Sequence, residues 1–188
     1  MTGEQEQIKK ASEQIGEMLG NKKSESVDKI SDEMMNKKLI PKEAIGMSDA
    51  MIEGIYGQAY RLYSTGKYKD AAELFRLLVM LNSTEPKYTM GLAACFHLLK
   101  DYKSAVNTYS LCGIIDPKSP IPHYHASDCY IQMKDPMSAI IALEMAISRS
   151  NEKPEFQSIK DRAALTIESL KKELKLKSSK KEGDPKNE

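Results

Sequence analysis

The stretch "YRLYSTGKYKDAAELF", residues 60–75, decides the fold because its pattern returns twice further along the chain. Shifting the sequence by 34 residues aligns Ala71 with Ala105, and a second shift brings Ala139 to the same place. The other aligned sets are Ala59, Ala93 and Ser127; Leu62, Phe96 and Tyr130; and Phe75, Tyr109 and Leu143. Each set keeps its character, either small or large and apolar, so the chain contains a threefold internal repeat.

The repeat predicts an all-α fold with three helix-turn-helix units at residues 52–85, 86–119 and 120–153, within a region that spans 48–153. A period of 34 with these residue types resembles the tetratricopeptide repeat. Small residues fall at positions 8 and 20 of each unit, where its two helices cross, and large apolar residues fall at positions 11 and 24. We therefore expect a solenoid of stacked helix pairs.

Residues that start helices stand at the predicted boundaries of these units. Pro86 and Pro120 occupy the first position of a unit, where a missing backbone N–H costs a helix nothing. Asp101 and Asp135 precede second helices, as N-cap residues do, and Pro136 then takes the first helical position. The capping chemistry thus predicts the same helix boundaries as the repeat.

Two kinds of segment flank the repeats. Residues 1–47 are expected to form N-terminal helices, because apolar residues recur there at helical spacing. Residues 154–176 are expected to form a C-terminal capping helix with Ile159 and Leu170 among its apolar positions. Residues 177–188 are polar and rich in lysine, so we expect a disordered tail.

Composition argues against several classes of protein. The 188 residues carry a formal net charge of +1, which gives no electrostatic case for binding nucleic acid or an anionic membrane. No stretch approaches the roughly 20 apolar residues that span a bilayer, and the N-terminus is too polar for a signal peptide. The three cysteines cannot all pair, so we expect a reducing cytosol.

The opening stretch also contains a Y-x-x-x-K string, from Tyr63 to Lys67, which short-chain dehydrogenases use as a catalytic pair. The repeat places Gly66 in the turn between two helices, so the two side chains need not share a helical face. The sequence has no G-x-G-x-x-G motif that would cradle a dinucleotide. We therefore expect no enzyme and no cofactor, and titration with NAD(P) would test the oxidoreductase alternative.

Cysteine and histidine residues are the candidate metal ligands, and their spacing argues against a metal site. Cys95, Cys112 and Cys129 are 17 residues apart, half a repeat, so each is expected at a mostly buried helical position. His123 and His125 lie two residues apart and therefore point in different directions on a helix. We expect one histidine to face a groove and the other to pack, with no metal bound.

The first helices of the three units are expected to line the concave face of the solenoid. Their outward positions are mostly apolar and aromatic, with few charges. A surface of this kind favours a peptide ligand, because tyrosine offers contact area and a hydroxyl that can meet a peptide backbone. Packing of these tyrosines under a terminal helix is the alternative. The predicted groove residues are Tyr56, Tyr60, Tyr63, Met90, Ala94, His97, Ile121, Tyr124, Asp128 and Ile131.

Three segments together resemble a known family. They are "IYGQAYRLYSTGKYKDAAELFRLLVMLN" (55–82), "GLAACFHLLKDYKSAVNTYSLCGIIDPKSPIPHYHASDCYIQMKD" (91–135) and "NEKPEFQSI" (151–159). The resemblance is to the class II chaperones of bacterial type III secretion, which serve the translocator proteins that form a pore in a host membrane. It covers roughly residues 48 to 170, and its most specific parts are "LYSTGKY" with "DAAELF", "GLAAC" with "YKSA", and "HASDCY".

The resemblance implies a cytoplasmic bacterial chaperone that keeps a membrane-active translocator soluble before export. The family holds a short, extended N-terminal segment of its client in the concave groove, and the secretion machinery then releases it. Family members commonly dimerise through N-terminal helices. The apolar positions available for this are Ile8, Ile15, Val27, Ile30 and Met34. A generic repeat scaffold that joins folded partners in a regulatory or assembly complex is the alternative.

The sequence departs from the family pattern in three places. Phe96 and His97 stand where the family often has Arg-Gln, so the middle of the groove is expected to prefer a different anchor. Tyr124 and His125 stand where the family commonly has Phe-His. Residues 1–47 match poorly, which leaves the dimer contact open.

Overall fold

The computed structural model describes residue 41, residues 45–150 and residues 153–182, with side chains up to residue 176. The chain divides into two compact units, Met1–Asp49 and Ala50–Glu188, and the repeats lie in the second. The residues predicted for dimerisation, Ile8, Ile15, Val27, Ile30 and Met34, lie outside the described residues.

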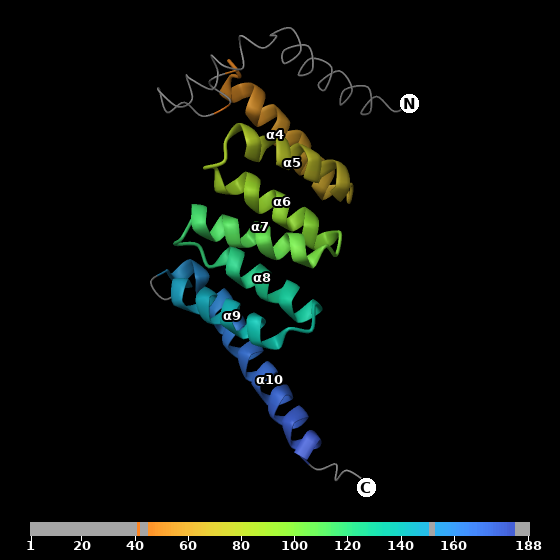
Figure 1. Cartoon of the computed structure of the whole chain (residues 1–188). Coiled ribbons are helices and arrows are strands. Elements are labelled where there is room, and N and C mark those ends of the chain that lie inside the picture. The colour runs from red at the N-terminus through yellow and green to blue at the C-terminus, as the bar shows by residue number, and fades with distance from the viewer. Residues whose placement is uncertain (1–40, 42–44, 151–152, 183–188) are drawn as a thin grey trace. The chain divides into compact units, whose positions relative to one another are not determined.

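Every regular element among the described residues is a helix, which confirms the all-α prediction. The elements are α4 (Asp49–Ser64), α5 (Tyr68–Leu81), α6 (Pro86–Leu98), α7 (Tyr102–Ile115), α8 (Ile121–Gln132), α9 (Pro136–Ser150), the 3-10 helix η1 (Pro154–Phe156) and α10 (Gln157–Glu182). From α5 onward, each α-helix packs against the next one in the sequence, as Figure 1 shows. Within the described part of the chain, no helix is both long and apolar enough to cross a membrane.

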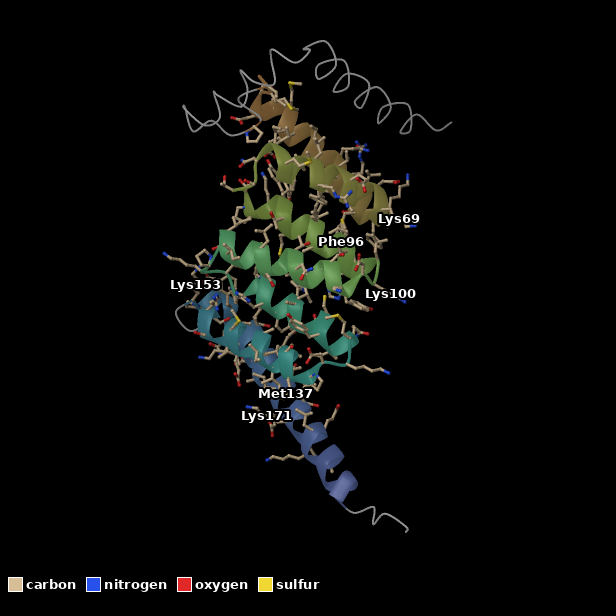
Figure 2. The ribbon with its side chains drawn as sticks, viewed as in Figure 1. Lys69, Phe96, Lys100, Met137, Lys153 and Lys171 are labelled. Carbon is tan, nitrogen blue, oxygen red and sulfur yellow. The ribbon has the colours of Figure 1, made fainter. Side chains whose placement is uncertain are left out.

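The three turns inside the helix pairs share one geometry. Gly66, Lys100 and Lys134 occupy the same repeat position with φ of 79°, 61° and 59°, and a left-handed residue of this kind commonly ends a helix. The next N–H in each turn donates to a carbonyl five residues back: Lys67 to Leu62 (2.9 Å), Asp101 to Phe96 (3.0 Å) and Asp135 to Tyr130 (2.9 Å). Lys100 lies at one edge of the stack, in the turn after α6 (Figure 2). The repeat found in the sequence is therefore also a repeat in backbone conformation.

The predicted caps of the second helices are confirmed. The Asp101 carboxylate accepts a hydrogen bond from the Ser104 N–H at 3.2 Å, and Asp135 accepts one from the Ser138 N–H at 3.0 Å. Each bond satisfies a backbone donor that has no partner within its own helix. Pro136 is the first residue of α9, as predicted.

The two prolines predicted to open first helices differ in their positions. Pro86 is the first residue of α6, as expected. Pro120 is the N-cap of α8 rather than its first residue, because its carbonyl accepts the first helical hydrogen bond, from Tyr124 N–H at 3.1 Å. The Ser119 hydroxyl accepts the Ile121 N–H at 3.3 Å, so the helix starts one residue later than predicted.

Small buried residues line the crossings between helices, at the positions that the repeat predicts. Ala59, Ala71, Ala93, Ala105, Ser127 and Ala139 are all fully buried. Among the large apolar residues beside these crossings, Leu62, Phe75, Tyr109 and Leu143 are buried, whereas Phe96 and Tyr130 are only partly buried. Because the small residues let the helix backbones approach, the large ones can fill the space on either side.

The C-terminal helix α10 covers the end of the last repeat. Ala163, Ile167 and Leu170 pack with Ile140 and Leu143 of α9 in one buried cluster. The remaining length of α10 extends past the stack in Figure 1 and continues to Glu182, so residues 177–182 are helical where a disordered tail was predicted. The lysines and glutamates there favour helix, and no glycine or proline occurs before Gly183.

Candidate functional site

The ten predicted groove residues lie on α4, α6 and α8, the first helices of the three repeats, and we call them the first-helix surface. Tyr60 is 57% exposed, and the other members are partly buried. Its members are Tyr56, Tyr60 and Tyr63 on α4; Met90, Ala94 and His97 on α6; and Ile121, Tyr124, Asp128 and Ile131 on α8.

Tyr56 is the centre of an aromatic group at the α4 end of this surface. Its ring centroid lies 6.4 Å from that of Tyr60, 6.1 Å from Phe75 and 5.8 Å from Tyr88. The Lys87 ammonium stands 4.7 Å from the Tyr56 centroid, which is a cation–π distance. The repeat positions did not identify Lys87 or Tyr88, although both directly follow Pro86 at the start of α6.

The ring contacts of Tyr56 bear on the alternative that the tyrosines only fill space under a terminal helix. Phe75 belongs to α5 and Tyr88 to α6, so Tyr56 packs between neighbouring repeats. Tyr60, one turn later, keeps most of its ring accessible. The α4 end of the surface thus combines a fixed ring with an exposed one.

The middle of the surface is polar, and we call its five residues the polar cluster: Tyr63, His97, Tyr109, His125 and Asp128. The Tyr109 ring stacks on His125 at 5.7 Å and meets His97 edge-on at 6.3 Å. Four different helices, α4, α6, α7 and α8, contribute to it. The spacing that revealed the repeat did not predict this grouping, because Tyr109 and His125 lie outside the four outward positions.

Burial controls the charge states within the polar cluster. It raises the pKa of Asp128, against the opposing effects of His125 and His97. Burial also lowers the pKa of His125, while Asp128 favours its protonated form and His97 opposes it. The phenol pKa of Tyr109 is strongly raised, chiefly by burial. The ordinary state of the cluster at neutral pH is one carboxylate among uncharged rings.

Several members of the surface also belong to the core. Tyr124 and Ile131 pack against the cluster that α9 and α10 share. Met90 packs against the core of the second repeat, with its sulfur 3.9 Å from the Cys112 sulfur. At the α8 end, the predicted groove residues therefore support the last repeat as well as face outward.

The Tyr63–Lys67 pair does not have the geometry of a catalytic pair. α4 ends at Ser64, Gly66 turns the chain, and Lys67 is the N-cap of α5. Burial raises the pKa of Tyr63, followed by smaller effects of Cys95 and two tyrosines. A tyrosine that transfers protons needs the opposite change, so this pair offers no activated phenol.

The cysteines are buried thiols, as predicted. All three are free, and burial raises the pKa to about 12 for Cys95 and to about 11 for Cys112 and for Cys129. Thiolate ligands are therefore disfavoured at these positions. No group of three or more potential ligands comes together within the part of the chain that the structure describes.

The two histidines of "PHYH" have different environments. His123 is buried, with its ring over Gly113 of α7, and its Nε2 has no hydrogen-bond partner in the structure. His125 is partly buried and stacks on Tyr109 in the polar cluster. One histidine therefore packs between helices and the other lies at the first-helix surface, which is the division that the sequence predicts.

An exposed apolar face on the second helices was not predicted. Its members lie on α5, α7 and α9, and Ile114 is 75% exposed. On α9, three of them recur every fourth residue and so share one side of the helix. We call the following residues the second-helix face: Met80, Leu111, Ile114, Met137, Ile141 and Met145.

Comparisons with known proteins identify relatives of this chain. A family model described as "Anaphase-promoting complex, cyclosome, subunit 3" matches residues 64–146. The Low calcium response locus protein H of Yersinia pseudotuberculosis serotype I is 32% identical over 125 residues, which cover 66% of this chain and 74% of that protein. The match to the second protein therefore includes most of both chains.

Two of the similar solved structures are complexes. PcrH of Pseudomonas aeruginosa, with the chaperone binding region of PopD, has a TM-score of 0.65 and 28% identity, covering 68% of this chain and 96% of PcrH. The type III secretion chaperone SycD of Yersinia enterocolitica, with a peptide of the translocator YopD, has a TM-score of 0.64 and 30% identity, covering 67% and 96%. SycD has also been solved as an alternative dimer. In sequence and in fold, this chain belongs to the family of type III secretion translocator chaperones.

Proposed function

We propose that this chain is a cytoplasmic type III secretion chaperone that binds an extended segment of a translocator protein on its first-helix surface. The observation that carries the proposal is family membership, together with two relatives solved with bound parts of translocators. The exposed Tyr60 and the ring of Tyr56 behind it supply the aromatic contact area that an extended peptide needs.

The proposed mechanism is binding without chemistry. A client with long apolar segments would aggregate or insert before export, and occupancy of the first-helix surface lowers its free concentration. Release is then carried out by the secretion machinery. The proposal includes a homodimer through the N-terminal residues 1–47, and the dimer of SycD supports it.

The test is co-expression with a translocator followed by affinity purification. Tyr60→Ala and the double variant Tyr56→Ala/Tyr60→Ala are expected to lose the client while keeping their helicity. Because Tyr56 also contacts Phe75 and Tyr88, the single variant at the exposed Tyr60 separates binding from folding. Normal client recovery with both variants would contradict the proposed surface.

The second-helix face favours a second candidate function, a scaffold that joins folded partners. Exposed aliphatic side chains such as Ile114 and Ile141 are those that a folded domain would cover. The matched control Ile114→Ala/Ile141→Ala removes comparable apolar area from the opposite helices. If this variant loses the client and Tyr60→Ala retains it, the scaffold becomes the better description.

A further inference from the structure

The polar cluster interrupts a surface that is otherwise suited to apolar side chains. Tyr56 and Tyr60 lie on one side of it along the stack, on α4, and Tyr124 and Ile131 lie on α8 with the last repeat. Asp128 is the one carboxylate among the ten residues of the first-helix surface. A peptide that runs along all three first helices would pass it.

The Asp128 carboxylate has no satisfying partner among the described residues. It is partly buried, and the structure shows neither a hydrogen bond nor an ion pair from it to any described side chain or backbone group. The groups that interact with it electrostatically are the imidazoles of His97 and His125 and the phenol of Tyr109. None of these carries a fixed positive charge, so a partly desolvated anion stays uncompensated.

We propose that the polar cluster is a subsite for one basic side chain, arginine or lysine, of the bound client segment, with Asp128 as its partner. The proposal rests on the proposed function and adds a sequence requirement to it. A client with a basic residue between its apolar anchors would gain an ion pair at this place, whereas a wholly apolar segment would bury the carboxylate unpaired.

The surroundings favour a cation over other ligands. Bringing an anion next to Asp128 would add like-charge repulsion, and covering it with a hydrocarbon would leave its oxygens without hydrogen bonds. The aromatic rings of Tyr109 and His125 stand beside the carboxylate. A guanidinium or ammonium group can lie against such rings while it donates to the oxygens, and arginine does both with one planar group.

A selection of displayed random peptides on the immobilised full-length chain tests the subsite without requiring that the client be identified. The wild-type protein is expected to enrich peptides that carry arginine or lysine at one fixed spacing from an apolar anchor. The isosteric variant Asp128→Asn is expected to lose that basic position while still enriching the anchor. Asp161→Asn on α10, an exposed carboxylate away from the first-helix surface, serves as the matched control and should enrich the same peptides as wild type.

Affinities of one synthetic peptide from the selection complete the test. The peptide is expected to bind Asp128→Asn about tenfold more weakly than wild type, the scale of a hydrogen bond to a charged group. Replacing its basic residue by glutamine should cost wild type the same factor and cost Asp128→Asn nothing further. This second change is made on the peptide, so it reports on the pair even if the protein variant is poorly folded.

The outcomes separate the subsite from the function on which it rests. Peptides that lack a basic position, or that keep it on Asp128→Asn, would overturn the subsite and leave peptide binding intact. A selection that yields no binding peptide on the wild-type chain would overturn both proposals.

Discussion

Adding one methyl group at Gly91 tests the packing between α5 and α6. A Cβ at Gly91 would lie 2.7 Å from Cδ1 of Phe75 and closer still to two other ring atoms. Phe75 is only 2% exposed, so its ring has no free space to enter. Overpacking of this kind costs about 1–3 kcal/mol, and alanine in a helix interior returns about 1 kcal/mol relative to glycine. We expect Gly91→Ala to lower the free energy of unfolding by about 1–2 kcal/mol.

Urea unfolding followed by far-ultraviolet circular dichroism measures this change, and α4 offers the matched control. A Cβ at Gly57 would meet nothing within 4 Å, so Gly57→Ala is expected to raise the free energy of unfolding by about 0.5–1 kcal/mol. If Gly91→Ala stabilised the chain as Gly57→Ala does, the close contact with Phe75 would be refuted.

A second substitution identifies the ring as the cause. Phe75→Leu alone loses buried area, but in the Gly91→Ala background it also makes room for the new methyl group. The double variant is therefore expected to be more stable than the sum of the two single changes predicts. Strict additivity of the two changes would mean that the methyl group disturbs something other than Phe75.

Two further predictions concern the turn residues and a buried histidine. Lys100→Gly and Lys134→Gly should each raise the free energy of unfolding by about 0.5–1 kcal/mol, because the left-handed strain that they remove exceeds the added chain entropy; a loss of stability in urea melts would contradict this. Burial, and then the charge of Arg149, lower the pKa of His123 in the folded state, so the unfolded chain binds protons more readily, and stability should fall as the pH drops below about 6.5. His123→Gln should flatten this dependence relative to wild type in melts at pH 7 and pH 5, and an equally steep loss in the variant would refute the role of His123.

The fold was predictable because the repeat constrains sequence and backbone together. Ala71 and its equivalents must stay small where helices cross, and Asp101 and Asp135 must cap, so both leave a visible period of 34 residues. The exact start of α8 was not predictable, because Pro120 suits the N-cap and the first helical position almost equally well. The length of α10 was misjudged because polar composition was given more weight than helix propensity.

The candidate surface was only partly predictable, because periodicity identifies the helix that carries a residue but not how deeply that residue lies. Tyr124 and Ile131 occupy outward positions, yet α9 and α10 use them as core. The apolar second-helix face escaped notice for the converse reason, since residues such as Ile114 read as core residues in a sequence. Burial of this kind depends on which neighbours pack alongside, and that information is distributed over distant segments.

The polar cluster shows what such a surface needs beyond apolar area. Aromatic contacts at Tyr56 and Tyr60 contribute affinity, but an extended peptide can slide over them with little loss, because every apolar anchor suits them comparably. A single carboxylate at Asp128 is different, since only one register of the peptide brings a cation to it and every other register leaves it unpaired. The energetic cost of the wrong registers, rather than the strength of the right contact, would then set both the alignment of the client and its choice.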